Sequence, residues 1–259
     1  MDFFSRDFQS VVNPREMVRA FTLRKGEPPE ALLLENLALI TFTPEDLQRF
    51  VQSNQQAKLI EAWRNRNPRI YRGEGWIALQ APYGAPGTIM LLEELVAFGV
   101  RRAVLLGYCG SIQRKISMGE VILPIEAIRE EGTSYHYLPE GEKSSPDPRI
   151  QKNLSDWMTR RGLPFHEGTI WTTDAPYRET PEKIGRYREE GVLAVEMEMA
   201  AVFAFGRARG ISIGAILLVS DEVREEGWNI GFFSTEIQST RKRVIDLFVD
   251  HLPKMISQR

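Results

Sequence analysis

Three carboxylates mark the part of the sequence where chemistry is most expected. Glu196 and Glu198 flank Met197 at the point where an apolar segment begins. Asp221 follows a mostly aliphatic run, residues 211–219. Carboxylates beside apolar segments are costly unless they are solvated, paired or used in a reaction. These two short stretches are therefore the first candidates for a functional site.

Each carboxylate has a structural and a chemical interpretation. Glu196 and Glu198 share a face if the chain is extended and diverge if it is helical. A carboxylate at a helix N-terminus is favoured by the helix dipole, where it either caps the helix or accepts both hydroxyls of a vicinal diol. Asp221 is either a turn residue or an acid that protonates a leaving group. The residues alone leave these alternatives open.

A glycine-rich segment, Gly107-Tyr108-Cys109-Gly110-Ser111, follows a predicted strand. Glycines at a strand end let backbone N–H groups approach an anion or a sugar, although a tight turn without function has the same pattern. The segment is not a P-loop, because no Gly-Lys-Ser or Gly-Lys-Thr follows it. Cys109 is expected to be a small buried residue. The aromatic stretch 228–233 is either a lid over an apolar ligand or an interface patch.

Composition limits the class of protein and of partner. The chain has 259 residues and a formal net charge of −2, so neither nucleic acid nor an anionic membrane is expected to bind it. One cysteine and three widely spaced histidines give no disulfide and no metal site. No signal peptide or membrane span is recognisable, which predicts a soluble, cytoplasmic protein. We expect one domain, residues 1–259, with residues 1–31 as an N-terminal arm.

Apolar patterning predicts strands that alternate with helices. The expected strands are residues 37–43, 76–81, 102–106, 120–124, 165–173, 192–195 and 211–219. The expected helices are residues 44–65 (capped by Thr43), 89–98, 149–161, 181–190, 199–209 and 236–256, with loops at 130–148 and 223–233. This order predicts an α/β fold, a three-layer αβα sandwich around a mixed, largely parallel twisted sheet.

Three motifs together resemble the nucleoside phosphorylase superfamily. They are Tyr-Gly-Ala-Pro-Gly-Thr at 83–88, Gly-Tyr-Cys-Gly-Ser-Ile at 107–112 and Val-Glu-Met-Glu-Met-Ala at 195–200. Residues 130–136 and 171–178 look most similar to the uridine-phosphorylase-like branch. The resemblance covers the chain from about residue 37 to the last helix. It implies that family's α/β fold and cleavage of an N-glycosidic bond.

The resemblance also implies a role for each motif residue. Glu198 would hold the ribose hydroxyls, Met197 would pack against the sugar, and Asp221 would protonate the departing base. Further substrate contacts are implied for Glu196, Gly107, Tyr108, Gly110, Arg178 and Ser220. The family needs no cofactor or metal, and phosphate is a co-substrate. It implies a homo-oligomer, a dimer or a hexamer, because a neighbouring chain completes family sites.

The acceptor half of the site departs from the family pattern. The loop that grips phosphate in the phosphorylases corresponds to residues 41–46, which contain no arginine. Leu105 and Tyr108 stand where an arginine and a serine or threonine are usual. Losing bidentate donors to a dianion is costly, so another arginine (Arg49, Arg72 or Arg178) substitutes or the acceptor is not phosphate. The family's 5′-hydroxyl histidine has no counterpart before His136.

The leading prediction is therefore a nucleoside phosphorylase, a pentosyltransferase that converts uridine or a purine nucleoside into free base and ribose 1-phosphate. The first alternative is a nucleosidase that uses water as the acceptor. The second alternative is a nucleoside-binding relative that has lost catalysis.

Overall fold

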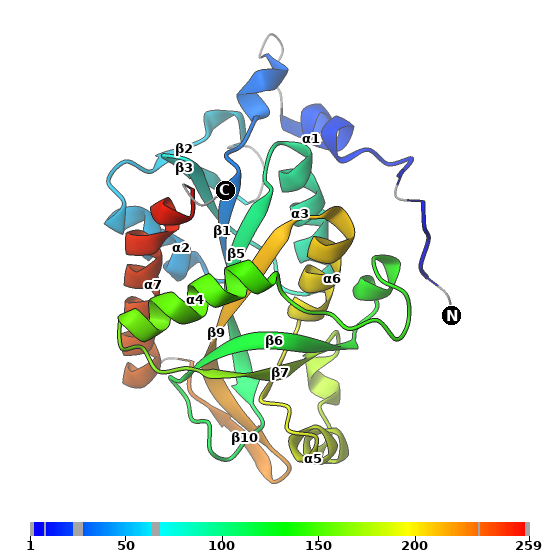
Figure 1. Cartoon of the computed structure of the whole chain (residues 1–259), viewed down its shortest axis with the longest axis vertical. Coiled ribbons are helices and arrows are strands. Elements are labelled where there is room, and N and C mark those ends of the chain that lie inside the picture. The colour runs from blue at the N-terminus through cyan, green and yellow to red at the C-terminus, as the bar shows by residue number, and fades with distance from the viewer. Residues whose placement is uncertain (1–2, 8, 23–27, 64–67, 233, 257–259) are drawn as a thin grey trace.

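A computed structural model describes residues 3–7, 9–22, 28–63, 68–232 and 234–256 (Figure 1). In this part of the chain ten strands form one sheet in the order β10-β9-β6-β7-β8-β5-β1-β4-β3-β2, and β9 also pairs with β5. The strands are β1 (Leu37–Thr41), β2 (Lys58–Leu59), β3 (Ile70–Gly73), β4 (Trp76–Gln80), β5 (Arg102–Ser111), β6 (Val121–Glu130), β7 (His166–Thr173), β8 (Ala194–Glu196), β9 (Ser212–Arg224) and β10 (Gly227–Ile230).

The sheet is mixed, as predicted. Strands β4, β1, β5 and β9 are parallel neighbours, and so are β6, β7 and β8. The antiparallel pairs are β2–β3, β3–β4, β5–β8, β6–β9 and β9–β10. Because the carboxyl ends of β1, β5 and β9 meet at one edge, that edge is where an open α/β sheet binds its ligands.

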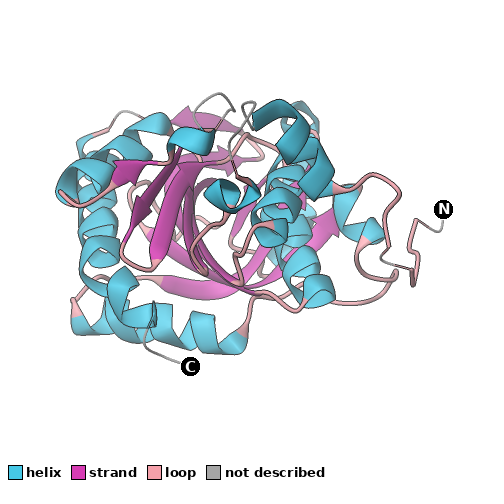
Figure 2. Ribbon diagram, turned by 90° about the horizontal axis from the view of Figure 1, so that it is seen from above, coloured by secondary structure: helices cyan, strands magenta, loops and turns pink. Residues whose placement is uncertain are grey.

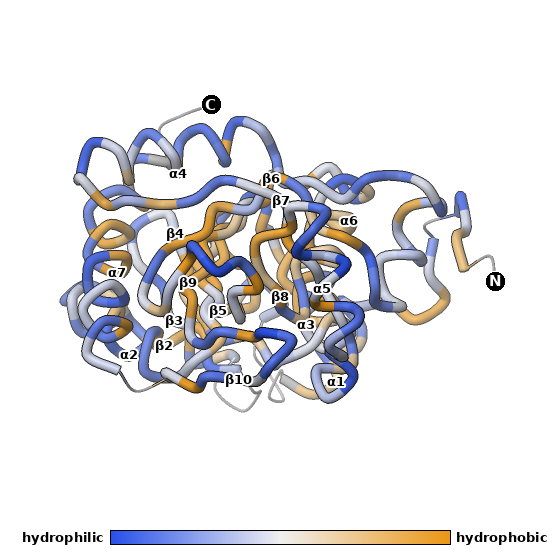
Figure 3. The backbone as a smooth tube through the Cα atoms, turned by 90° about the horizontal axis from the view of Figure 1, so that it is seen from below, coloured by the Kyte–Doolittle hydropathy of each residue, from blue (hydrophilic) through white to orange (hydrophobic). Residues whose placement is uncertain are grey.

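Helices cover both faces of the sheet (Figure 2). The helices are α1 (Pro14–Thr22), α2 (Pro44–Ser53), α3 (Ala85–Ala97), α4 (Pro148–Arg160), α5 (Pro181–Glu189), α6 (Met199–Arg209) and α7 (Thr235–Ile256). One apolar core combines α2, α4 and α7 with one face of the sheet, and a second core combines α3 and α6 with the other. The strands form the apolar centre of the tube in Figure 3, and polar residues gather on the outer helices. The three-layer prediction is confirmed.

Local signals placed several helix ends correctly. The Thr43 hydroxyl accepts the Asp46 N–H and caps α2, as predicted. Gly210 ends α6 in the left-handed region, with φ of 65°. The predicted extension of the α2 helix to residue 65 is wrong, because the Asn54 side chain donates to the Phe50 carbonyl and closes the helix at Ser53. Residues 64–67 lie outside the described residues.

Several strands differ from their predicted bounds. β5, β6 and β9 extend beyond their apolar runs, because ladder pairing continues through residues that face solvent or a site. β2, β3 and β10 were not predicted, and β10 lies within a segment predicted to be a loop. The N-terminal arm contains α1 and a 3₁₀ helix, η1 (Pro29–Leu32). Among the described helices, none has the length and apolar content needed to cross a lipid bilayer.

Candidate active site

Glu196 caps helix α6. Its Oε2 accepts the backbone N–H groups of Glu198 at 2.6 Å and Met199 at 2.8 Å. Its Oε1 accepts the hydroxyl of Thr172, and that hydroxyl accepts the Ala200 N–H at 2.9 Å. The first N–H groups of a helix have no acceptor within the helix. Thr172 in β7 and Glu196 in β8 supply these acceptors. The capping interpretation therefore describes Glu196, and its side chain faces α6.

Glu198 is buried at the junction of two helices. Its Oε1 accepts the N–H of Gly84, the residue that precedes α3, at 2.6 Å. Gly84 has φ of 88°, which a residue with a Cβ rarely adopts, so the Pro82-Tyr83-Gly84 turn that presents this N–H requires glycine. Burial raises the pKa of Glu198 to about 7, and the Gly84 and Met197 N–H groups oppose that shift.

The pKa of the Glu196 carboxyl is also raised, first by burial and then by the nearby charge of Glu198. Its three donors favour the ionised form and oppose the shift. Met197, between the two glutamates, is partly exposed while its neighbours on both sides are buried. The motif thus presents one apolar side chain and one carboxylate beside each other.

Gly110 in β5 joins this motif to Asp221. Gly110 is the ladder partner of Val195 in β8 on one side and of Asp221 in β9 on the other. A Cβ at position 110 would lie 2.9 Å from Oδ2 of Asp221, so glycine makes room for the carboxylate. The ladder has an irregularity between Cys109 and Gly110. Both Gly107 and Gly110 lie inside β5 and not after the strand, and Gly110 is the one that pairs with both neighbouring strands.

Both oxygens of Asp221 accept a hydrogen bond. Oδ1 accepts the Ser220 hydroxyl at 2.6 Å, and Oδ2 accepts the indole N–H of Trp228 at 2.7 Å. Cys109 is buried as expected, and its thiol donates to the Leu218 carbonyl at 3.7 Å. Burial raises the pKa of that thiol well above its usual value, with smaller contributions from the charges of Asp221 and Glu196. Cys109 is therefore an un-ionised thiol that feels the charges of both Asp221 and Glu196.

Glu179, in the loop before α5, is a further acidic group at this end of the site. Burial and the charge of Asp221 raise the pKa of Glu179 to about 7, while the Lys183 ammonium lowers it. The carboxyl of Glu179 therefore titrates near neutral pH in the field of Asp221. Nothing in the local sequence distinguishes it from other loop glutamates.

Residues 41–46, which the family resemblance compares with the phosphate-gripping loop, include a buried carboxylate. Asp46 is fully buried, and the Tyr108 hydroxyl donates to it at 2.9 Å. The Thr43 hydroxyl donates to Oδ2 at 2.6 Å, and the Arg241 guanidinium in α7 pairs with Oδ1. Arg241 also donates to the Thr43 hydroxyl at 3.1 Å. We call Thr43, Asp46, Tyr108 and Arg241 the Asp46 cluster.

The other predicted residues have varied locations. A Cβ on Gly107 would lie 2.9 Å from Leu217, so this glycine allows close packing of β5 on β9. Leu105 is fully buried in the apolar core that contains α3 and α6. Arg178 is exposed in the 3₁₀ helix η4 (Pro176–Arg178). Arg72 is bound elsewhere, to the Leu33 carbonyl and the Glu35 carboxylate.

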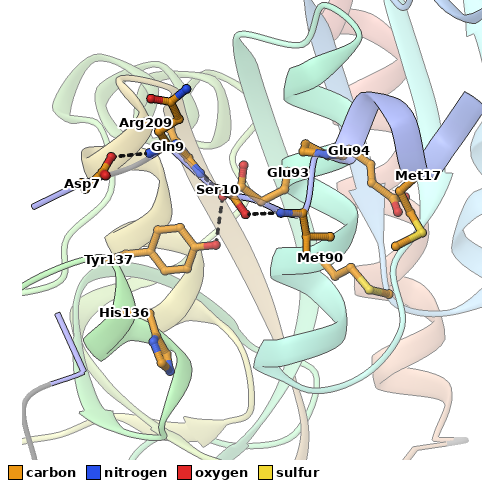
Figure 4. A pocket seen from close by; sticks show the side chains of 12 residues that line it. Asp7, Gln9, Ser10, Met17, Met90, Glu93, Glu94, His136, Tyr137 and Arg209 are labelled. Carbon is orange, nitrogen blue, oxygen red and sulfur yellow. Dashed lines mark hydrogen bonds and ion pairs between the residues drawn. The ribbon is translucent and has the colours of Figure 1, made fainter. Parts of the chain in front are cut away.

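A pocket of about 690 Å³ lies apart from these carboxylates, between the N-terminal arm, α3 and α6 (Figure 4). In it the Glu93 carboxylate accepts from the Tyr137 hydroxyl at 3.0 Å and pairs with Arg209 at 2.5 Å. The apolar side chains of Met17 and Met90 also line it. Neither Glu198 nor Asp221 contributes to its lining.

Sequence reasoning missed four parts of the site: the Thr172–Glu196 cap, the Trp228 contact with Asp221, Glu179 and Arg241. Each depends on an interaction between two different strands, helices or loops. Only the capping alternative for a glutamate of the Glu-Met-Glu motif was foreseeable.

Comparisons with known proteins agree on one family. The family model described as the phosphorylase superfamily matches residues 36–250. A guanosine phosphorylase from Halorubrum lacusprofundi is 29% identical over 190 residues, which cover 72% of this chain and 78% of that protein. A DeoD-type purine nucleoside phosphorylase from Bacillus cereus is 28% identical over 185 residues, covering 70% and 76%.

Solved structures share the fold. A purine nucleoside phosphorylase from Toxoplasma gondii in complex with immucillin-H superposes with a TM-score of 0.80 at 22% identity, covering 88% of this chain and 94% of that one. A uridine phosphorylase from Vibrio fischeri superposes with a TM-score of 0.74 at 21% identity, covering 86% and 94%. Since the family model spans most of the chain, this protein belongs to the phosphorylase superfamily.

Proposed function

We propose that this protein is a nucleoside phosphorylase, a pentosyltransferase that cleaves the N-glycosidic bond of a ribonucleoside with phosphate. The observation that carries the proposal is the placement of two carboxylates by one residue. Gly110 pairs with the strand that leads to Glu198 and with Asp221 itself. A sugar at Glu198 would therefore present its base toward Asp221.

The geometry supports a division of labour. Glu198, held by Gly84 at 2.6 Å, accepts the ribose hydroxyls, while partly exposed Met197 packs against the sugar. The electron pair of the breaking C1′–N bond moves to the base, which takes a proton from the Asp221 carboxyl group. A phosphate oxygen forms the new bond to C1′, and hydrogen phosphate returns a proton to Asp221. The products are free base and ribose 1-phosphate.

For the base, an acid at position 221 suits purines, whose nitrogen can take the proton. The similar proteins from Halorubrum lacusprofundi and Bacillus cereus are named guanosine and purine nucleoside phosphorylases. Residues 171–178 resemble the uridine branch, so uridine belongs in any substrate panel.

The test is chromatographic detection of free base after incubation with inosine, guanosine, adenosine and uridine in phosphate buffer. Base released from at least one nucleoside shows N-glycosidic cleavage, and ribose 1-phosphate as the sugar product supports the phosphorylase. No release from any of them, at enzyme concentrations near that of the substrate, contradicts it.

A second candidate is hydrolysis, and the Asp46 cluster favours it. The Asp46 carboxylate pairs with the Arg241 guanidinium, and that guanidinium also donates to Thr43. Because Arg241 is engaged inside the cluster, it is not available to grip a phosphate dianion. The sugar product distinguishes the candidates: ribose 1-phosphate formed only with phosphate indicates phosphorolysis, and free ribose formed without phosphate indicates hydrolysis.

The proposed enzyme is a cytoplasmic homo-oligomer of single-domain subunits. Tyr83 and Met90 are large apolar side chains with 68% and 61% exposure, at and after the turn that holds Glu198. A second copy that covers them would also shield the sugar site from water. Light scattering coupled to size-exclusion chromatography tests this, and a monomer at assay concentration contradicts it.

A further inference from the structure

The aromatic hairpin made by β9 and β10 contacts the acid of the site directly. Trp228 is the second residue of β10, and all four residues of that strand are exposed. Its indole N–H nevertheless donates to Oδ2 of buried Asp221 at 2.7 Å. An indole N–H on an exposed strand can be satisfied by water, so this contact is not needed to stabilise a core.

This contact completes the orientation of Asp221. The Ser220 hydroxyl holds Oδ1 at 2.6 Å, and Gly110 leaves no side chain under Oδ2. With the Trp228 N–H on Oδ2, each oxygen has one directed donor and the carboxyl plane is fixed. Proton transfer depends on such alignment, since a general acid must lie within hydrogen-bond reach of its target.

The Trp228 ring also offers a surface for a planar base. Its side chain is 56% exposed although its N–H is bound, so part of the ring is open beside Asp221. The Phe232 ring packs edge-to-face with it, with ring centroids 6.4 Å apart and planes at 75°. Aromatic rings stack on nucleobases with little preference among them.

We infer that Trp228 is a positioning residue of this site: its N–H orients Asp221 for proton transfer to the leaving base, and its ring borders the base. The inference rests on the proposed function and adds to it a residue outside the motifs that define the family resemblance. It assigns the aromatic hairpin to the substrate and not to a protein interface.

The experiment compares two leaving groups in three variants. Trp228→Phe keeps an aromatic ring and loses the N–H, Trp228→His keeps a ring N–H, and Asn229→Ala is the matched control on the same exposed strand. The substrates are the best nucleoside of the panel and 4-nitrophenyl β-ribofuranoside. The nitrophenolate leaves as an anion and takes no proton from an acid.

For the nucleoside, Trp228→Phe is expected to lower kcat about tenfold with KM within about twofold, the size of one lost directed hydrogen bond. Trp228→His recovers part of that loss, and Asn229→Ala behaves as the wild type. For the nitrophenyl riboside, Trp228→Phe keeps the wild-type kcat. This difference between leaving groups is something a merely structural role would not produce.

Two results overturn the inference while leaving the proposed function intact: a wild-type kcat for Trp228→Phe on the nucleoside, or an equal loss on both substrates. A wild-type enzyme that releases neither base nor nitrophenolate contradicts the proposed function and, with it, the role of Trp228.

Discussion

The backbone N–H of Gly84 donates to Oε1 of Glu198 at 2.6 Å, and this bond ties together the N-termini of α3 and α6. It fixes one oxygen of a buried carboxylate at the edge where parallel strands end. Two glutamates that look equivalent in sequence therefore differ. Glu196 caps α6, whereas Oε1 of Glu198 is bound to the turn that precedes α3.

Replacing Glu196 should reduce stability more than binding. Glu196→Ala leaves the Glu198 and Met199 N–H groups without their acceptor, so we expect a loss of about 2 kcal/mol in the free energy of unfolding. Thr172→Val, which removes the second part of the cap, should lower stability in the same direction. Urea titration checks both. A Glu196→Ala protein of wild-type stability but weakened nucleoside binding would assign Glu196 to the substrate instead.

Glu179 should govern the alkaline side of the pH–rate profile. Its pKa is raised to about 7 by burial and by Asp221, so the carboxyl is neutral below that pH and anionic above it. The anion repels the negative charge that develops on the departing base, so kcat/KM should fall as pH rises through about 7. Glu179→Gln stays neutral and should retain activity to higher pH. An alkaline limb that is identical in wild type and variant would remove Glu179 from the account.

Asp46 and Arg241 should be strongly coupled. Asp46→Asn leaves the Arg241 charge buried with a weaker partner, which should cost about 3 kcal/mol of stability. The double variant Asp46→Leu with Arg241→Met should lose less stability than the sum of the losses of Asp46→Leu alone and Arg241→Met alone. Additive losses in this double-mutant cycle would show that the pair contributes no interaction of its own. Lys152→Met, on an exposed helical ion pair, is the control and should change stability by less than about 0.5 kcal/mol.

The loss of activity caused by replacing Asp221 should depend on which base leaves. Asp221→Asn keeps the shape and an acceptor oxygen for Trp228 but supplies no acidic proton. We expect kcat on purine nucleosides to fall about 100-fold and kcat on uridine to fall less, because the proton is needed at a purine nitrogen. Parallel steady-state assays on inosine and uridine decide this. The same loss on both bases would take Asp221 away from the base.

Local patterns predicted those parts of the structure that depend on neighbours in the chain. Thr43 caps α2 through its hydroxyl, and Gly210 ends α6 through its left-handed backbone. The sugar-binding roles of residues 195–200 stay predictions. The same reasoning made α2 too long. The helix is closed by the hydrogen bond from the Asn54 side chain to the Phe50 carbonyl, and the residues around Asn54 include no glycine or proline that would have predicted this end.

What the sequence could not predict are contacts between distant segments. Asp46 and Arg241 are separated by most of the chain, and only the packing of α2 beside α7 brings them together. No residue of β10 is buried, so no apolar pattern marks this strand in the sequence. Its register with β9 comes from backbone hydrogen bonds. The Trp228 contact with Asp221 follows from that unpredicted hairpin.

The most direct test of the central claim, that Glu198 holds the ribose of a nucleoside during cleavage, is a cycle between enzyme and substrate. It measures kcat/KM for wild type and Glu198→Gln with the best ribonucleoside and with its 2′,3′-dideoxy analogue, and the cycle cancels the difference in intrinsic reactivity between the two substrates. We expect Glu198→Gln to lose about 100-fold or more on the ribonucleoside and less than about tenfold on the analogue, because only the ribonucleoside has the 2′- and 3′-hydroxyls that donate to Glu198. Equal losses on the two substrates, or none on the ribonucleoside, would contradict the account.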